Sequence, residues 1–272
     1  MKKMWMLFAA GCFAAVLCGC EKKGTVSGVV MDPFTGKPVE LPTVWMDGSV
    51  FGTQTAKYPY GADLVNGKFK FDEVPAGEYL IKARRNGYVL GQQRFTTTPE
   101  NPNAELTLFA FSDKIDPGLY KYPCVAPDKI QNSWVIWAAT CSESGAAYRA
   151  SFTEEIAKGK KKEKRVNKLP DPLVVDANFS VLFHNKGSVT TPITAVSYAA
   201  RPGKVKDHQD CKGFGDGETD GIFADKSKTT DLKVTYKAEG LFEVTGTLPK
   251  GKQIVQMLQD GKSVQTYYFE VK

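Results

Sequence analysis

The chain reads Gly67-Lys68-Phe69-Lys70-Phe71 and then, after the turn Val74-Pro75-Ala76-Gly77, Glu78-Tyr79-Leu80-Ile81-Lys82-Ala83. Apolar and polar residues alternate on both sides of this turn. Successive side chains of a β-strand point to opposite faces, so residues two apart share one face. The stretch therefore predicts two strands whose common inner face carries Phe69, Phe71, Tyr79, Ile81 and Ala83.

The residues around this stretch, 24–112, continue the same pattern. Short alternating runs are separated by clusters of Gly, Pro and Asn at intervals of about 8–12 residues, which is typical of a β-sandwich. The region has no helical repeat with caps. We predict strands at 26–30, 43–46, 68–71, 78–83, 88–96 and 104–111.

Two motifs make the prediction for this first domain, 24–112, more specific. One is Val26-Ser27-Gly28-Val29-Val30 with the turn Thr35-Gly36-Lys37-Pro38, and the other runs from Gly67 to Tyr88. Both resemble the carboxypeptidase regulatory-like family, which has a transthyretin-like sandwich fold. The resemblance implies a non-catalytic module that serves as a spacer, a folding aid or a contact surface. The chain departs from the family by an insert, Ser49–Ala62.

Residues 113–272 predict a second β-rich domain that is sandwich-like, so the fold class is all-β. Strand-like runs at 173–175, 179–183, 193–199, 232–236 and 241–248 precede a hairpin across Asp260-Gly261. The segments Lys158–Lys168 and Lys204–Lys228 are predicted to be a basic loop and a polar loop.

An internal echo connects the two domains. Gly240-x-Phe242-x-Val244 followed by Pro249-x-Gly251 repeats Gly67-x-Phe69-x-Phe71 followed by Pro75-x-Gly77, with one extra residue before the turn. One interpretation is a second, diverged sandwich. The other is that any strand–turn–strand unit produces the same pattern.

The first residues predict export. Met1-Lys2-Lys3 precedes an apolar run that is shorter than the roughly 20 residues a membrane span needs, as in a secretory signal. The run ends in Leu17-Cys18-Gly19-Cys20, which resembles the lipobox of bacterial lipoproteins. The resemblance implies a signal peptide over 1–19, thioether lipidation of Cys20, a tether over 20–23 and acyl anchoring to the cell envelope. Glu21 after the lipid site favours the outer membrane over the inner.

The positive charge is concentrated in one segment. The formal net charge is +6, and Lys158–Lys168 contains seven basic residues and one acid. Such a run can contact anionic lipid or acidic polysaccharide, or it can be a solvated loop. No aromatic residues interleave it, so it does not favour nucleic acid. Candidate ligand contacts are Lys160, Lys161 and Lys162, together with Tyr58 and Tyr60 of the insert, whose rings could stack on a sugar or enter a protein interface.

The cysteines indicate an oxidising compartment with few disulfides. Cys12 and Cys18 leave with the signal, and Cys20 carries lipid. Cys124, Cys141 and Cys211 remain, for which one disulfide and one free thiol is the simplest outcome. All three pairings stay open.

The residues for catalysis and cofactor binding are sparse. His184 and His208 are the only histidines, and neither is followed by Glu at the zinc-carboxypeptidase spacing. His208 with Cys211 offers too few zinc ligands. The acidic loop 216–225 lacks the EF-hand spacing for calcium. We therefore predict no cofactor and no metal.

The leading function is a non-catalytic, membrane-anchored envelope lipoprotein that binds a protein or glycan partner, or acts as a structural module. The alternative is an envelope hydrolase that uses a pair of carboxylates from the second domain. The carboxylates available for such a pair are Asp171, Asp176, Asp210, Asp216 and Asp220.

Overall fold

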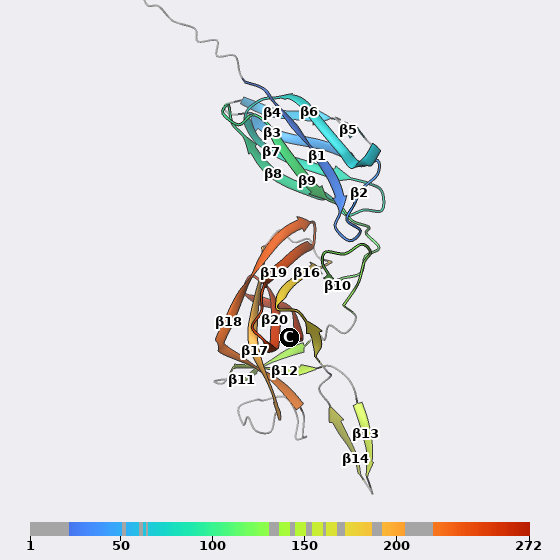
Figure 1. The fold of residues 1–272 in the computed structure, drawn as a ribbon, viewed down its shortest axis with the longest axis vertical. Coiled ribbons are helices and arrows are strands. Elements are labelled where there is room, and N and C mark those ends of the chain that lie inside the picture. The colour runs from blue at the N-terminus through green and yellow to red at the C-terminus, as the bar shows by residue number, and fades with distance from the viewer. Residues whose placement is uncertain are drawn as a thin grey trace, which may run out of the picture.

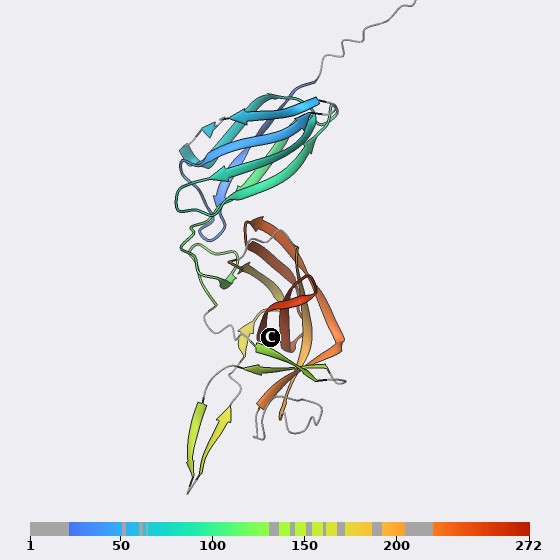
Figure 2. The same ribbon diagram turned by 180° about the vertical axis from the view of Figure 1, so that it is seen from behind.

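The computed structural model describes residues 22–50, 53–59, 62–63, 65–130, 136–141, 145–150, 154–159, 162–167, 172–186, 192–204 and 220–272. Within these residues the regular structure is β-strand, apart from one 3-10 turn, η1 (Val65–Gly67). The all-β prediction is therefore confirmed. A sandwich at the N-terminal end and a larger curled sheet follow one another along an elongated molecule (Figures 1 and 2).

The N-terminal sandwich consists of two sheets that face each other. One has the order β2-β1-β6-β5, with β9 added in parallel to β1, and the other has the order β4-β3-β7-β8. The strands are β1 (Gly24–Asp32), β2 (Lys37–Pro38), β3 (Thr43–Val50), β4 (Thr53–Pro59), β5 (Ala62–Asp63), β6 (Lys68–Val74), β7 (Gly77–Arg84), β8 (Gly91–Thr97) and β9 (Ala104–Phe109).

The two sheets are connected by the consecutive strands β6 and β7, whose apolar side chains share one core. β6 belongs to the first sheet and β7 to the second, so the chain crosses the core at Val74-Pro75-Ala76-Gly77. Burying one large apolar side chain contributes about 1.5–3 kcal/mol, which favours a shared core. The predicted inner face is confirmed, because all five of its residues are buried in one cluster: Phe69, Phe71, Tyr79, Ile81 and Ala83.

The C-terminal sheet is continuous and curled, with the order β10-β16-β19-β18-β17-β20-β21-β15. β18 belongs to both halves of this sheet, since it pairs with β17 up to Leu232 and with β19 from Lys233. The halves face each other across one core. The strands are β10 (Gly118–Lys121), β15 (Leu173–Val175), β16 (Asn178–His184), β17 (Ile193–Lys204), β18 (Asp220–Ala238), β19 (Leu241–Thr247), β20 (Gly251–Gln259) and β21 (Lys262–Val271), with β11 (Ile136–Cys141) and β12 (Gly145–Ala150) beside β18.

The strand pairing of the N-terminal sandwich recurs in the C-terminal sheet. In the sandwich, β6 pairs with β1 and β5, and β7 pairs with β3 and β8. In the sheet, β19 pairs with β16 and β18, and β20 pairs with β17 and β21. All of these pairs are antiparallel, and their members follow the same order along the chain. β18 takes the places of β4 and β5 together.

This recurrence decides between the two interpretations of the sequence echo. The echoing residues are the crossover from β6 to β7 and the crossover from β19 to β20, at the same place in the same topology. Equivalent positions are buried in both, as for Phe69 and Phe242 or Ile81 and Val255. The structure thus supports a second, diverged sandwich whose two halves remain joined through β18.

Both predicted loops are wrong in part, because strand pairing extends into them, and the predicted insert also contains a strand. The insert Ser49–Ala62 contains β4, which forms a hairpin with β3. The basic segment lies in the hairpin of β13 (Glu154–Gly159) and β14 (Lys162–Asn167). In the polar segment, β17 continues to Lys204 and β18 begins at Asp220, because these two strands pair along their outer parts. The predicted domain boundary at residue 112 falls between β9 and β10.

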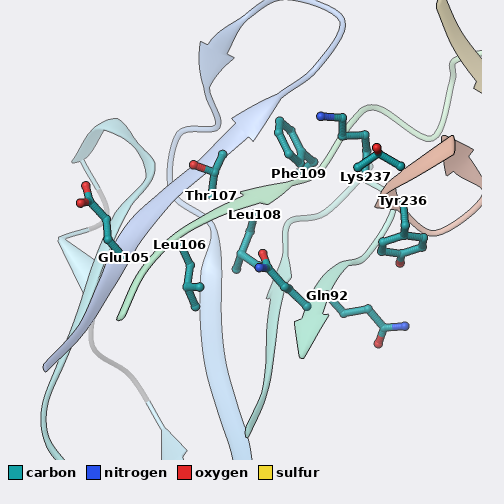
Figure 3. A pocket seen from close by; sticks show the side chains of 10 residues that line it. Gln92, Glu105, Leu106, Thr107, Leu108, Phe109, Tyr236 and Lys237 are labelled. Atoms are coloured by element: carbon teal, nitrogen blue, oxygen red, sulfur yellow. The ribbon is translucent and has the colours of Figure 1, made fainter. Parts of the chain in front are cut away.

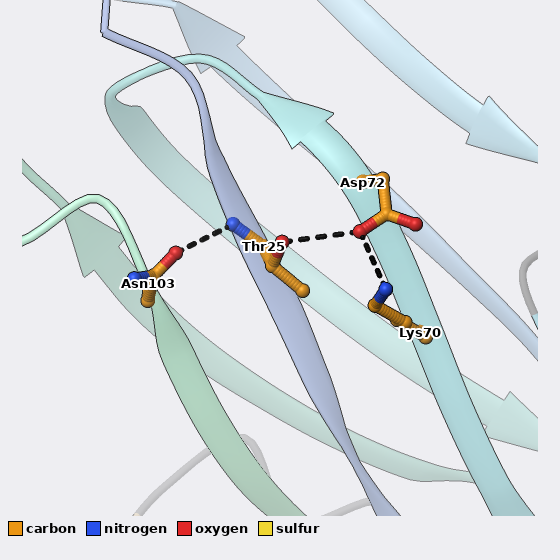
Figure 4. Close-up of polar contacts among 4 residues, drawn as sticks. All are labelled: Thr25, Lys70, Asp72 and Asn103. Atoms are coloured by element: carbon orange, nitrogen blue, oxygen red, sulfur yellow. Dashed lines mark hydrogen bonds and ion pairs between the residues drawn. The ribbon is translucent and has the colours of Figure 1, made fainter.

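Polar contacts secure the outer end of the N-terminal sandwich (Figure 4). The Asp72 carboxylate accepts a hydrogen bond from Thr25 Oγ1 at 3.1 Å and pairs with Lys70 Nζ at 3.0 Å. The hydrogen bond from Lys70 lowers the pKa of Asp72. The Thr25 amide donates to Asn103 Oδ1 at 2.8 Å, so the start of β1 is held to both of its neighbours.

We predict that Gly67→Ala destabilises the protein more than Gly87→Ala does. Both glycines have positive φ, 67° and 74°, which costs a residue with a Cβ about 1–2 kcal/mol. A Cβ at Gly67 would also lie 2.7 Å from the Val39 carbonyl oxygen, whereas one at Gly87 meets nothing within 4 Å. Urea unfolding measures the difference. Equal losses of unfolding free energy would contradict the close approach at Gly67.

Candidate functional site: a groove at the junction

An apolar seam joins the N-terminal sandwich to the C-terminal sheet. Phe34 and Phe111 come from the N-terminal side. The ring centroid of Phe34 lies 5.4 Å from that of Phe111 and 4.9 Å from that of Tyr120. Leu182, Ala238 and Leu241 complete the buried cluster from the C-terminal side. Because side chains from both parts pack in one buried cluster, the seam holds the N-terminal sandwich against the C-terminal sheet.

His184 lies in this seam as a buried, neutral side chain. Its Nδ1 is 3.0 Å from the Asp116 carbonyl oxygen, which also accepts a hydrogen bond from the Tyr120 hydroxyl at 2.6 Å. A carbonyl only accepts, so Nδ1 carries the proton. The ring edge faces Phe111 at 5.1 Å. Burial lowers the pKa of His184, and nearby Lys186 and Lys129 act in the same direction.

Beside the seam, strands β8 and β9 of the N-terminal sandwich diverge. They are joined at one end, where the Val89 amide donates to the Phe111 carbonyl at 2.8 Å and Tyr88 forms a bridge with Ser112. Gly91 packs against the backbone of Phe109, which leaves no room for a side chain. Beyond this point β8 follows one sheet and β9 the other, which opens a gap between them.

This gap is a groove of about 390 Å³, within the range of ligand sites, roughly 300–1,000 Å³. β9 supplies its floor, β8 one wall, and the C-terminal part of β18 closes one end (Figure 3). Half of the lining residues are uncharged and polar, three are apolar and two are charged. The ten lining residues are Gln92, Gln93, Glu105, Leu106, Thr107, Leu108, Phe109, Thr235, Tyr236 and Lys237.

Tyr236 is the aromatic residue that the groove presents to solvent. It is 40 % exposed, while its ring packs edge-on against Phe242 at 6.0 Å. Partial burial raises the pKa of Tyr236, and a hydrogen bond with the Gln92 side chain opposes that shift. The hydroxyl therefore stays protonated at neutral pH. Because the Tyr236 ring is fixed by Phe242 and carries a hydroxyl, it can contact an apolar surface and donate a hydrogen bond at the same time.

Lys237 contributes less charge to the groove than its position suggests. Its Nζ forms an ion pair with Glu243 at 2.7 Å, and both side chains are mostly buried, 12 % and 19 % exposed. The ammonium also lies 4.7 Å from the Phe109 ring centroid and 5.7 Å from that of Tyr122. The ion pair with Glu243 and the two aromatic rings already balance the charge of Lys237, and they link the groove to the seam.

Two of the five contact residues predicted from sequence fall on described strands. Tyr58 is in β4 and Lys162 begins β14, while Tyr60, Lys160 and Lys161 fall outside the described residues. Their role as ligand contacts stays a prediction.

Of the three cysteines predicted to remain in the mature chain, Cys124 has a described side chain. Cys124 is a free thiol that donates to the Pro33 carbonyl at 3.6 Å, and burial raises its pKa. Cys141 ends β11. Cys20 and Cys211 lie outside the described residues.

The acidic residues considered for metal binding or hydrolysis form no cluster in the described part of the chain. No group of three or more His, Cys, Asp or Glu side chains there could hold a metal ion. Asp225 accepts hydrogen bonds from Ser227 and pairs with Lys228 at 3.6 Å. Asp176 is exposed between β15 and β16, and Asp220 begins β18. Asp171, Asp210 and Asp216 lie outside the described residues.

Comparison with known proteins gives distant structural likeness. No protein-family model matches the chain, and no curated protein matches it. A DUF3823 family protein from Bacteroides uniformis is 13 % identical, with a TM-score of 0.24 over 90 % of this chain and 96 % of that one. A proposed carbohydrate-binding protein from the same species is 10 % identical, with a TM-score of 0.25 over 91 % and 96 %.

The major pilin subunit of Bacillus cereus is also 10 % identical, with a TM-score of 0.25 over 92 % of this chain and 67 % of that one. These TM-scores are too low to carry an argument, so the fold rests on the strand pairing described above. Among the described residues, no helix is long and apolar enough to cross a membrane.

We predict that the stability of the seam depends on pH through His184. The folded-state pKa is lowered from about 6.5, so the unfolded chain binds the proton more tightly. The stabilising contribution is complete above about pH 6.5 and is lost as pH falls through the folded-state pKa. Urea unfolding between pH 7.5 and pH 5 should show this loss.

In His184→Gln the side-chain amide can still donate to the Asp116 carbonyl but does not titrate. We expect a smaller loss of unfolding free energy in this variant across the same pH range. The same pH dependence in the variant and the wild type would show that another group is responsible.

Proposed function

We propose that this chain is a non-catalytic, membrane-anchored envelope lipoprotein, and that its partner binds in the groove between β8, β9 and β18. The observation that carries the proposal is Tyr236, a half-exposed ring beside neutral amides in a groove built on strands. Groups on rigid strands hold their geometry, so little order has to be created when a ligand binds.

The sequence supports the anchor. A signal peptide that ends at Gly19 would leave Cys20 as the lipidated N-terminal residue, only two residues before Lys22. A lipid there would lie within about 7 Å of the described chain. β1 starts at the end of the molecule opposite to the β13–β14 hairpin, so such an anchor would hold the hairpin away from the membrane (Figures 1 and 2).

The partner is a protein or a glycan in this proposal. Both can use an exposed aromatic ring with flanking hydrogen-bonding side chains. The basic hairpin provides a second contact for an acidic partner at the far end of the molecule. The resemblance of the N-terminal motifs to the carboxypeptidase regulatory-like family also favours a contact module. The described residues offer no observation in favour of the carboxylate-pair hydrolase.

The anchor is tested by Cys20→Ser. We expect the wild-type chain, expressed with its signal, to partition into the detergent phase of a Triton X-114 extract and to incorporate labelled palmitate. The variant should lose both properties, since it lacks the sulfur that forms the thioether. Detergent partition that is unchanged in the variant would contradict the lipoprotein proposal.

The groove is tested by Tyr236→Ala, with Tyr88→Ala as the control. Tyr88 lies outside the groove, where its ring contacts Arg85 at 4.9 Å. We expect Tyr236→Ala to weaken retention on immobilised envelope polysaccharide, or on immobilised envelope protein, at least tenfold without a large change in Tm. Tyr88→Ala should bind as the wild type does. Equal retention of all three proteins on both matrices would refute the site.

A further inference from the structure

The outer edge of β8 is open within the described structure. β8 pairs with β7 and with no other described strand, and β9 pairs only with β1. The pairing of β8 runs unbroken from Gly91 to Thr97. Natural edge strands are usually guarded by several charges, by proline or by a bulge, because a free edge can pair with another chain. β8 has one charged residue, Arg94, and no proline.

Gln93 shows that the sandwich interior is uncovered at this edge. It lies opposite Ile81, which is buried in the core, and directly paired residues project from the same face of a sheet. Gln93 therefore belongs to the inner face. It is nevertheless exposed and lines the groove. An inward-facing residue reaches solvent only where the layer that should cover it is missing.

The C-terminal sheet shows the same edge with its cover present. β21 is the counterpart of β8, and Tyr267, which pairs with Val255, is the counterpart of Gln93. Tyr267 is 1 % exposed. The outer edge of β21 carries an added parallel strand, β15. Leu173 and Val175 of β15 pack against the core, while Val174 between them is 48 % exposed.

From this pair of edges we infer that the partner of the groove is a protein that adds an extended strand to β8, in parallel, as β15 is added to β21. The inference rests on the proposed function, since it names the partner of the same groove. The strand takes backbone hydrogen bonds from β8 and directs alternate apolar side chains toward Leu106, which is only partly buried, whereas Leu108 is already covered. Its intervening residues face solvent. Arg94 of two copies would oppose each other if β8 paired with itself around that residue, which disfavours a second copy of this chain.

The probe for the test is a phage library of random twelve-residue peptides, selected on the full-length protein. Selected peptides are synthesised, and their binding is measured by fluorescence anisotropy. We expect apolar residues at alternate positions. We also expect N-methylation of the peptide backbone to weaken binding at least tenfold at every second position and less than threefold between them. Main-chain pairing along one edge predicts this period of two, and side-chain recognition does not.

Protein variants complete the test. Gln92→Pro, Gln93→Pro and Arg94→Pro are compared individually, because alternate amides of β8 face either β7 or the open edge. We expect at least one of them to keep the wild-type Tm and lose peptide binding at least tenfold. Tyr236→Ala should weaken the same peptides.

The outcomes separate the two proposals. Polysaccharide retention that depends on Tyr236, with no peptide showing the period of two, would overturn the added strand and leave the groove as a glycan site. A concentration-dependent dimer abolished by the β8 proline variants would overturn a separate partner in favour of self-pairing. Binding of peptide and polysaccharide that is insensitive to Tyr236→Ala would overturn the proposed function itself.

Discussion

The arrangement of both parts of this protein depends on a chain crossover between consecutive strands that keeps the apolar side chains of both strands on the same core. Val74 and Leu248 are the last buried residues before the two crossovers, and a proline follows each of them. Proline cannot donate to a ladder, so it suits the point where a strand leaves its sheet. The next strand resumes alternation against the same core. A one-residue slip at either crossover would turn the buried set outward, which is why the register is strongly specified.

The seam between the halves follows a different rule. Its residues come from turns and strand ends, so no periodic pattern in the sequence marks them. Phe34 lies within the tight turn that begins at Asp32, and the Asp32 carboxylate accepts a hydrogen bond from the Phe34 amide at 2.8 Å. Burial nevertheless raises the pKa of Asp32. This local geometry directs the Phe34 ring out of the N-terminal sandwich and against Tyr120. The seam then holds β18 where it can close the groove.

Strand alternation can be predicted from the sequence, whereas contacts made by turns and strand ends cannot. Alternation predicts the inner face from Phe69 to Ala83, because that signal is local and periodic, whereas the echo at Gly240 left a second sandwich as one of two interpretations. Pairing between distant strands is not local. The outer part of β18 therefore looked like a polar loop, although β17 pairs with it. The sequence predicts Tyr236 only as the end of a strand, since its exposure depends on how β8, β9 and β18 meet. The lipobox-like ending Leu17-Cys18-Gly19-Cys20, by contrast, is a purely local signal and lies outside the described residues.

The groove lies at the edge where the two sandwiches differ. Two sandwiches of the same topology need the same number of layers to bury their inner faces. One copy has a buried tyrosine and a covering strand at its edge, and the other has an exposed glutamine and a groove. Glutamine suits an edge that is exposed to water when no partner is bound, because its amide can form hydrogen bonds with water or with a partner's backbone. An exposed aromatic residue at the same place would favour non-specific association. The difference between Gln93 and Tyr267 is therefore what we expect of an edge that is adapted to be covered by another molecule rather than by its own chain.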